Sequence, residues 1–270
     1  MYFLCIGAHP DDNELNVGGL ATRLRRRGDQ VKFVSVTNGD KGHFADEYKA
    51  NPEALAARRL VEAQNAAAVI GASYETLGIH DGEVYVDKPS TEAMVRCIRG
   101  FGEPGSGPDL VLFNRPLDYH RDHRYTSQLV LDATYMLTVP LMCPDTRHLD
   151  RMPVFAYWYD DFKDLQPFVA EIQVPIDDCL EEKTSMVCAH ASQLFEWLPY
   201  NAGVLHEVPA DGVARRARVR GIVERRGAYR AEKSANARLN DGPCQHAEAF
   251  RICEYGRHPQ DDELRQLFGL

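Results

Sequence analysis

Short apolar runs alternate with longer amphipathic segments over the first 160 residues of the chain. Such runs are typical of buried strands, whereas apolar positions three and four residues apart are typical of helices. The predicted strands are residues 2–8, 31–36, 75–79, 110–113 and 154–159. Because strands and helices alternate, we expect parallel strand pairing through right-handed crossovers, as in an α/β fold.

Helices are predicted between these strands. They cover residues 18–28, 53–70, 91–101 and the later part of 114–137. The first of them is expected to open at Gly18-Gly19, after a polar loop at residues 9–17. Ser90 is the expected N-cap of the third, because its hydroxyl can accept a hydrogen bond from a free backbone N–H. In an open sheet of this kind, sites lie in the loops beyond the carboxyl ends of the strands.

The pattern is weaker after residue 160. Residues 168–174 alternate like a more exposed strand, and residues 249–253 predict a late strand. Residues 177–197 are predicted to be helical, and the Arg-rich residues 211–237 partly so. Since the chain has no internal repeat and no low-complexity linker, we expect residues 1–270 to form a single domain.

Composition supports a globular protein and narrows its partners. Hydrophobic residues make up 44% and charged residues 26% of the chain, which is enough apolar material for a packed core. The formal net charge of −9 argues against nucleic acid or an anionic membrane as the main partner. We therefore expect a small-molecule substrate.

The cysteines and the hydropathy point to a reducing compartment. The chain has seven cysteines, which is an odd number, and no two of them form a C-x-x-C pair. Neither a disulfide framework nor a thiolate zinc site is therefore expected. The apolar start of the chain is too short for a signal peptide and lacks a basic lead-in. No segment approaches the ~20 apolar residues of a membrane helix. We expect a cytoplasmic protein.

The first candidate chemistry lies directly after the first predicted strand. Residues 8–14 read Ala-His-Pro-Asp-Asp-Asn-Glu. His9 and Asp12 are three residues apart on one tight loop, so both can reach one cation. Asp11, between them, can point elsewhere, towards a metal-bound water.

The second cluster follows the fourth predicted strand and reads Asp-Tyr-His-Arg-Asp-His over residues 118–123. If a helix starts here, His120 and His123 share one of its faces. Both clusters follow buried strands, so they can converge above the sheet. Three nitrogen and oxygen ligands with an open fourth position are typical of a catalytic zinc site.

Each cluster alone also has a plain structural interpretation. His-Pro-Asp-Asp could be a solvated turn, because Pro and Asp are common turn formers. His120 and His123 could be surface residues at the start of a helix. The two clusters at equivalent topological positions favour a shared metal site over two coincidences.

These motifs resemble those of the LmbE-like (PIG-L) deacetylases. The resemblance is carried by residues 8–14 with Gly18-Gly19 and by the His-Arg-Asp-His run at 120–123. Weaker spacings extend it over nearly the whole chain: Arg59-x-x-Glu62 before Gly71, Lys183 before residues 190–193, and residues 247–250. The resemblance implies a Rossmann-like α/β fold, with a mostly parallel sheet and helices on both faces.

The resemblance also implies roles for the clustered residues. Zinc would be held by His9, Asp12 and His123, and Asp11 would be the general base. His120, oriented by Asp122, would steady the oxyanion of the reaction. His and carboxylate ligands would accept Fe²⁺, Co²⁺ or Mn²⁺ as well as zinc. Whether Asp11 or His120 protonates the leaving amine is left open.

Three further residues are candidates for substrate contact. Arg59 would match a substrate-contacting arginine of the family. Arg121 stands where the family often has proline, which leaves the metal assignment intact but could alter the site rim. The resemblance suggests that the helix at 177–197 lines the site through His190, although a buried helix with one satisfied histidine fits the spacing equally well.

Three other segments are open to two interpretations. The arginines between residues 215 and 230 could grip an anionic substrate or a neighbouring subunit in a homo-oligomer, although a solvated helix face is the commoner case. The aromatic residues 155–159 favour core packing over sugar stacking. The loop at 38–43 could be a rim or lid of the site.

The sequence thus predicts a zinc-dependent hydrolase that removes an acyl group, most simply acetyl, from the nitrogen of an amino sugar or its conjugate. An amidase acting on a thiol conjugate or an acylated antibiotic precursor is an alternative. A nucleotide-binding module is a third, but the first strand–helix turn has His-Pro-Asp-Asp where G-x-G-x-x-G would be needed.

Overall fold

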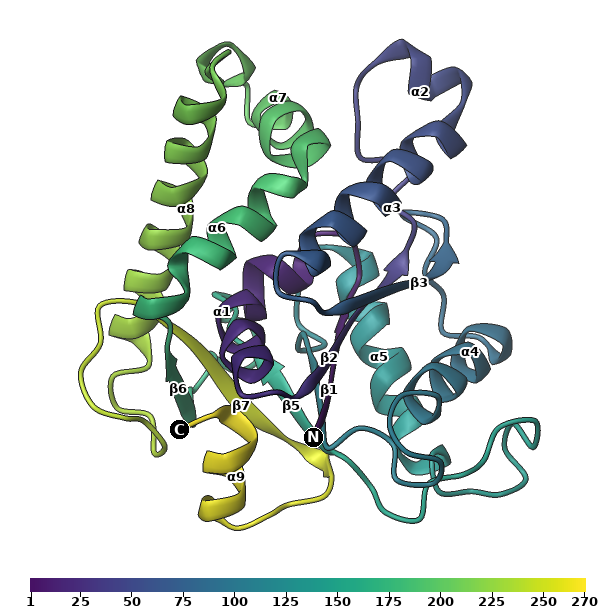
Figure 1. Ribbon diagram of the computed structural model, residues 1–270. Helices are drawn as coiled ribbons and strands as arrows, with labels where there is room; N and C mark the ends of the chain where they lie inside the picture. Colours follow the sequence, from purple (N-terminus) through teal and green to yellow (C-terminus); the bar gives the residue numbers. More distant parts are fainter.

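The computed structural model describes residues 1–270 and is built on one seven-stranded sheet (Figure 1). The strands are β1 (Tyr2–Gly7), β2 (Gln30–Thr37), β3 (Ser73–Ile79), β4 (Leu110–Phe113), β5 (Val154–Trp158), β6 (Ile172–Pro175) and β7 (Ala247–Gly256). Their order across the sheet is β3-β2-β1-β4-β5-β7-β6. Strands β1 to β5 pair in parallel, and β7 runs antiparallel to both β5 and β6. The predicted α/β fold with a mostly parallel sheet is confirmed.

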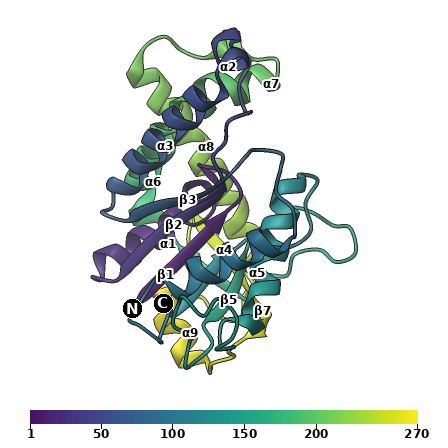
Figure 2. The ribbon, with the colours of Figure 1, turned by 90° about the vertical axis from the view of Figure 1, so that its right-hand side faces the viewer.

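Helices cover both faces of the sheet (Figure 2). They are α1 (Asp12–Arg26), α2 (Asp46–Ala50), α3 (Pro52–Ala68), α4 (Lys88–Arg99), α5 (Arg121–Met136), α6 (Leu180–Ala189), α7 (Leu198–Asn201), α8 (Gly212–Lys233) and α9 (Asp261–Phe268), with short turns η1 (Asp177–Cys179), η2 (Gln193–Trp197) and η3 (Leu205–Glu207). One face packs against α1, α3, α6, α8 and α9, and the other against α4 and α5. None of the helices has the length and apolar character needed to cross a membrane.

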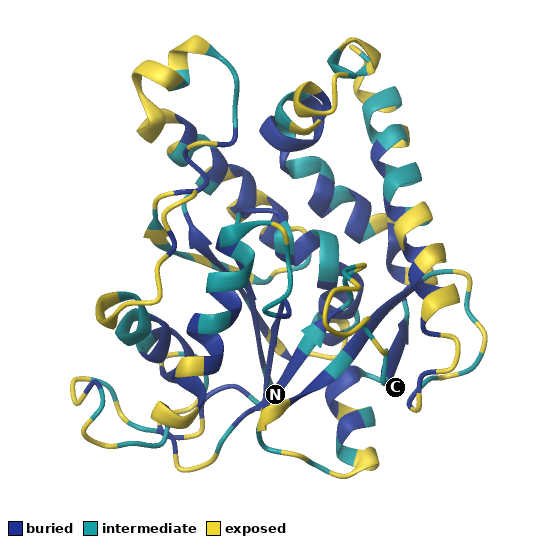
Figure 3. Ribbon diagram, turned by 180° about the vertical axis from the view of Figure 1, so that it is seen from behind, coloured by how far each residue is buried: buried dark blue, intermediate teal, exposed yellow.

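Strand β1 shows why the predicted strands are apolar throughout. Phe3 and Cys5 belong to the core on the α1 and α6 face, whereas Leu4 and Ile6 belong to the core on the α4 and α5 face. A strand covered on both sides needs apolar side chains at every position. Most residues of the central strands are accordingly buried, and exposed residues gather in the loops and on outer helix faces (Figure 3).

The predicted start of the first helix is wrong. Helix α1 begins at Asp12, so most of the loop predicted at residues 9–17 is helical. Acidic side chains in a first turn interact favourably with the helix dipole, which suits Asp12 to this place. Gly18 and Gly19 lie inside the helix instead, where close packing requires them: a Cβ on Gly19 would lie 2.4 Å from Cγ2 of Ile176.

Two other boundaries also differ from the predictions. The N-cap of α4 is Asp87 rather than Ser90, because the Asp87 carboxylate accepts the backbone N–H of Ser90 at 2.9 Å. The helix predicted at 177–197 is interrupted at His190, after which the chain continues as the π-helical turn η2.

The bounds of the late strands also differ from the predictions, whereas the Arg-rich helix lies where it was predicted. Strand β6 begins at Ile172, and its first three residues are buried, unlike the exposed strand predicted at 168–174. Strand β7 extends beyond the predicted residues 249–253 at both ends because it pairs with β5 as well as β6. Helix α8 covers Gly212–Lys233, so the partly helical segment predicted at 211–237 is confirmed.

The strand order creates a place for a site. Strand β1 lies between β2 and β4, and the chain turns back across the sheet between β1 and β4. At such a switch point the loops that leave the two strands diverge and open a crevice. The loop after β1 leads into α1, and the loop after β4 leads into α5. The two predicted clusters therefore lie next to each other, at the end of β1 opposite to the N-terminus (Figure 1).

Candidate metal centre and cavity

The three predicted metal ligands meet at one point. Nδ1 of His9 lies 3.1 Å from Nε2 of His123. One carboxylate oxygen of Asp12, Oδ2, lies 3.8 Å from the same nitrogen of His9 and 3.6 Å from that of His123. The loop after β1 supplies His9, the first residue of α1 supplies Asp12, and the first turn of α5 supplies His123.

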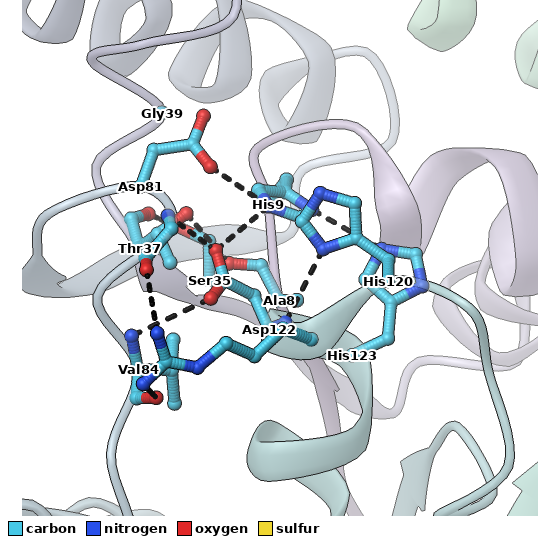
Figure 4. A network of polar contacts seen from close by, with 12 residues as sticks. Ala8, His9, Ser35, Thr37, Gly39, Asp81, Val84, His120, Asp122 and His123 are labelled. Carbon is cyan, nitrogen blue, oxygen red and sulfur yellow. Dashed lines mark hydrogen bonds and ion pairs between the residues drawn. The ribbon is translucent and has the colours of Figure 1, made fainter.

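Carboxylates orient both imidazole rings from behind. Figure 4 shows the two that lie beside His9, Asp81 and Asp122. The other ring nitrogen of His123, Nδ1, lies 2.7 Å from Oδ2 of Asp118. Nε2 of His9 lies 3.1 Å from Oδ1 of Asp81 and 3.4 Å from Oδ2 of Asp122. A neutral imidazole that donates its proton to a carboxylate presents a lone pair on its other nitrogen.

This arrangement requires positive charge between the two rings. Lone pairs on Nδ1 of His9 and Nε2 of His123 would face each other beside the carboxylate of Asp12, and only a proton or a cation relieves that repulsion. The pKa of His9 also reflects this preference for positive charge. Burial lowers the pKa, but the hydrogen bonds of His9 to Asp122 and Asp81 outweigh burial and raise the pKa to about 10. Imidazole nitrogens and a carboxylate oxygen are ligands that suit zinc, so the residues present fit the ion implied by the sequence.

Asp12 is held in place by the backbone. Its Oδ2 accepts the N–H groups of Ala8 at 2.8 Å and His9 at 2.9 Å. Burial raises the pKa of Asp12, but the facing rings of His123 and His9 and these two hydrogen bonds lower it below its usual value. The carboxylate is therefore ionised and ready to bind a cation.

A third imidazole, His120, stands beside the other two. Its ring centroid lies 4.7 Å from that of His9 and 5.0 Å from that of His123. The three histidines also form a possible ligand set by themselves, and His9 with Asp81 and Asp122 forms another. The set of His9, Asp12 and His123 alone combines orienting carboxylates behind both rings with a carboxylate in front.

The predicted orientation of His120 needs correction. We expected the carboxylate of Asp122 to hold it, but that carboxylate is fully buried, accepts the N–H of Gly82 at 2.6 Å and contacts His9. It is the backbone N–H of Asp122 that donates to Nδ1 of His120, at 3.2 Å. Burial and the neighbouring rings lower the pKa of His120, which favours a neutral ring.

Asp11 lies on the wall of the cavity with a strained backbone. Its φ is 131°, a conformation that side chains other than glycine rarely adopt, and such strain gathers at functional sites. Oδ1 of Asp11 lies 3.7 Å from Nη2 of Arg59. Burial raises the pKa of Asp11 to about 6, against the lowering effect of Arg59.

Arg59 holds two loops of the site together. Its guanidinium donates to the carbonyl oxygens of Pro10 at 2.7 Å and Gly39 at 3.1 Å. The close approach at Gly39 requires glycine, since its φ is 69° and a Cβ there would lie 2.3 Å from Nη1 of Arg59. The side chain lines the cavity, but only 2% of the residue is exposed. Arg59 therefore fixes the loops that contain Pro10 and Gly39, next to Asp11.

Two residues expected at the substrate lie elsewhere. Arg121 stacks on Tyr85, with its guanidinium carbon 4.1 Å from the ring centroid, and donates to the carbonyl of Val84, so it points away from the cavity. His190 is 1% exposed, and its Nε2 lies 3.3 Å from Oε2 of Glu14 in α1. The interruption of the helix at His190 turns that ring into the core and sends Gln193 to the cavity instead.

The cavity beside these residues has a volume of about 780 Å³, within the range of small-molecule sites. It is lined on one side by His9, Asp12 and His123. The other sides include Asp81, Tyr119, Tyr159, Trp197, Arg226 and Tyr229. Lys41 and Gly42 also line it, which agrees with a rim at residues 38–43. Tyr159 likewise reaches the cavity from the end of the aromatic run predicted to pack in the core.

Asp81 was missed although the sequence carried a signal for it. It follows β3, and its backbone N–H donates to Asp40 at 2.9 Å, which fixes the loop after β3 against the loop after β2. A polar residue directly after a predicted strand is a site candidate in this fold class. Arg226 belongs to the arginine run whose role the sequence left open, whereas Tyr229 carried no comparable signal, because it lies within a long helix.

Comparison with known proteins agrees with this geometry. A family model described as PIG-L, GlcNAc-PI de-N-acetylase, matches residues 4–134. A diacetylchitobiose deacetylase of Thermococcus kodakarensis is 28% identical over 212 residues, which are 73% of this chain and 73% of the relative. The segment matched by the family model begins in β1 and ends in α5, and it contains His9, Asp12 and His123.

Solved structures share the fold over nearly the whole chain. An N,N'-diacetylchitobiose deacetylase of Pyrococcus horikoshii aligns with a TM-score of 0.72 and 22% identity, over 97% of this chain and 88% of that one. A 4-carboxy-2-hydroxymuconate hydratase of Pseudomonas putida aligns with a TM-score of 0.70 and 17% identity, over 96% and 98%. Since these two proteins catalyse different reactions, the fold alone does not decide the chemistry.

Proposed function

Taking this chain as a PIG-L (LmbE-like) protein, on the match over residues 4–134, we propose that it is a zinc-dependent deacetylase. Its substrate would be an N-acetylated amino sugar or a conjugate of one, as the descriptions of its deacetylase relatives suggest. The observation that carries the proposal is the pair of imidazole nitrogens 3.1 Å apart beside the Asp12 carboxylate, each ring backed by another carboxylate.

His9, Asp12 and His123 would hold the ion. Zinc supplies Lewis acidity, which makes a water easier to deprotonate near neutral pH and polarises an amide carbonyl. The fourth side of the cluster faces the cavity, as a catalytic site needs. Asp81 and Asp118 would keep the two rings in the tautomers that bind a cation.

Asp11 would accept the proton of the attacking water. Its carboxylate lines the cavity next to the cluster but is not among the three atoms that converge on the ion. Arg59 fixes its loop through the carbonyl of Pro10, so the carboxylate is positioned before a substrate arrives. A positioned base of this kind removes the proton as the amide carbonyl is attacked.

His120 would stabilise the charge that develops on the carbonyl oxygen. Because its Nδ1 accepts the N–H of Asp122, the ring proton sits on Nε2, which makes His120 a neutral donor on the cavity wall. A pre-positioned donor lowers the barrier without reorganisation during the reaction. The proton for the leaving amine could then return from Asp11, which has just received one.

The rest of the cavity suits a sugar. Tyr119, Tyr159 and Trp197 offer aromatic surface on several of its walls, and Asn16 and Asn201 offer amide groups. Aromatic faces with a few polar groups are typical of sites that bind polar ligands with apolar faces. Dinucleotide binding is disfavoured, because the turn between β1 and α1 presents His-Pro-Asp-Asp and no glycine-rich approach for a pyrophosphate.

The proposal is tested by acetate release. Purified protein loaded with zinc, Fe²⁺, Co²⁺ or Mn²⁺ would be assayed against a panel of N-acetylated amino sugars, with N-acetylated thiol conjugates as a second panel. We expect metal-dependent acetate release from sugars and its loss on chelation. Zinc bound at one equivalent without acetate release from any acetamide would contradict the proposal, and hydration of an unsaturated acid would favour the reaction named for the Pseudomonas neighbour.

A further inference from the structure

The arginines of α8 fall into two groups. On the outer side of the helix, Arg216 pairs with Glu181, and Arg220 pairs with both Glu181 and Glu224. On the inner side, Arg226 and Arg230 line the cavity. The basic run of the sequence is therefore neither one solvated face nor one binding surface.

Arg230 anchors the helix to the metal site. It is buried and donates to the backbone carbonyls of Leu15 and Asn16 at 3.2 and 3.4 Å, and to Oδ1 of Asn16 at 2.6 Å. Asn16 itself donates to the carbonyl of Asp12 at 2.8 Å. This chain of contacts fixes α8 relative to the helix turn that supplies a metal ligand.

Arg226 lies one turn before Arg230 on the same face of α8 and has no carboxylate within ion-pair distance. Its one hydrogen bond is to Oδ1 of Asn16, at 3.3 Å. A guanidinium has five N–H donors in a planar fork, so most of the hydrogen-bonding capacity of Arg226 remains unused.

The other cations of the cavity wall are already engaged. Lys41 is paired with Glu83, and Arg59 donates to two loop carbonyls. The neighbouring carboxylates of Asp160 and Asp161 form no ion pair with Arg226: Asp160 pairs with Arg115 at 2.6 Å, and Asp161 accepts the Tyr159 hydroxyl at 3.0 Å. Arg226 is therefore the one cationic group of the cavity that is left available for a ligand.

We propose that Arg226 binds an anionic group, a phosphate or a carboxylate, on the part of the substrate away from the acetamide. The inference rests on the proposed function and narrows its substrate class to amino sugars with an acidic substituent. The guanidinium fork matches two oxygens of either anion. Tyr229, which lines the same wall three residues further along α8, would flank the bound group.

The test compares three N-acetylglucosamine derivatives that differ only at the anomeric substituent: the 1-phosphate, the carboxymethyl glycoside and the methyl glycoside. Wild-type protein should show kcat/KM at least about tenfold higher for one or both charged compounds than for the methyl glycoside, the size expected for hydrogen bonds to a charged group. The two charged compounds distinguish a phosphate site from a carboxylate site.

Arg226→Met should reduce this preference to about one, and Arg226→Lys should restore part of it, since it returns the charge without the fork. Arg225→Met is the matched control, because Arg225 is an exposed neighbour on α8 that does not line the cavity. It should keep the wild-type preference. Thermal unfolding of each variant checks that α8 is intact.

A binding measurement separates this inference from the proposed function. Glucosamine 1-phosphate and methyl glucosaminide would be titrated by calorimetry into the wild-type protein and Arg226→Met. Tighter binding of the phosphate that depends on Arg226 supports the inference even if no acetate release is found. An equal preference in the two proteins, in binding and in turnover, overturns it and leaves the deacetylase proposal standing.

Discussion

The two halves of the molecule contribute to the cavity in different ways. Up to the end of α5, the proposed metal ligands, Asp11, Asp81 and His120 each lie in a loop or first helical turn after a parallel strand. After β5, the loop that begins at Tyr159 lines part of the cavity, and further wall comes from within helical segments, by Trp197 in η2 and by Arg226 and Tyr229 in α8. The first half holds the proposed metal ligands at the edge of the sheet, and the second half supplies the opposite wall of the cavity.

The comparison indicates that the residues for chemistry and the residues for substrate specificity come from different parts of the molecule. Loops at the carboxyl ends of buried strands hold ligands rigidly, which suits a metal and a base. Helix faces that pack across from them can change residue by residue without disturbing the metal. The hydratase that shares this fold shows that one arrangement of the sheet serves more than one reaction. Substitutions in the first half should therefore change metal binding and turnover, and substitutions in the second half should change substrate preference.

The largest expected effect comes from removing a metal ligand in the first half. His123→Ala should lose both bound zinc and acetate release, the latter to background, because two ligands remain where three are needed. Metal analysis of the purified variant and the acetate assay check this. His206→Ala, at an exposed histidine of η3, is the control and should keep both. Full metal content in His123→Ala would remove His123 from the ligand set.

Asp11→Asn should separate binding from chemistry. The amide keeps the size of the side chain but cannot accept the proton, so turnover should fall by about 10²–10⁴-fold while zinc content stays the same. The two measurements are the same as for His123→Ala, which makes the variants directly comparable. Turnover equal to that of the wild-type protein would exclude Asp11 as the base.

Asp118→Asn should have a smaller effect on the metal. The carboxylate of Asp118 lies behind His123, and loss of such an orienting group weakens metal affinity by about 10–100-fold. Competition with a zinc chelator measures the change. Asp132→Asn, on the exposed side of the same helix, provides the control. An affinity unchanged relative to that control would show that Asp118 does not tune His123.

The smallest expected effect concerns the pH dependence of stability where the halves join. Lys183 of α6 is buried against Glu248 of β7 and donates to the carbonyl of Leu15 in α1 at 3.1 Å. Burial lowers the pKa of Lys183 to about 8, despite the attraction of Glu248. Between about pH 8 and 10 the unfolded chain binds more protons at this lysine, so the free energy of unfolding should gain ~1 kcal/mol per pH unit from it.

Denaturant unfolding at several pH values measures that slope. The double variant Lys183→Met with Glu248→Leu removes both charges, so other titrating groups remain as the baseline. The slope of the wild-type protein should exceed that of the double variant over this range. Equal slopes would mean that Lys183 keeps the proton affinity of an exposed lysine.

Local patterns predicted the central strands and the convergence of His9, Asp12 and His123. The strands are buried on both faces, so their apolar runs were unambiguous, and the ligands follow those runs directly. The start of α1 was placed too late because polar residues at 12–17 look like a loop, although they form the first turns of a helix whose glycines pack inside. There tertiary packing outweighed local composition.

Features that depend on contacts between residues far apart along the chain could not be predicted from the sequence. The carboxylate of Asp122 turns to Gly82 and His9 because the loop after β3 approaches α5, and no spacing along the chain records that approach. Likewise, His190 is buried because the helix is interrupted there, and Arg226 reaches the cavity because Arg230 ties α8 to α1. Both outcomes depend on how the C-terminal helices pack on the rest of the fold.

The proposed metal site is tested most directly by a crystal structure of the zinc-loaded protein, with anomalous diffraction recorded at the zinc edge. We predict one strong anomalous peak between Nδ1 of His9, Oδ2 of Asp12 and Nε2 of His123, at about 2.0–2.2 Å from each atom. A peak elsewhere, or none at this point under saturating zinc, would contradict the central claim that two loops of the sheet edge close around a single ion.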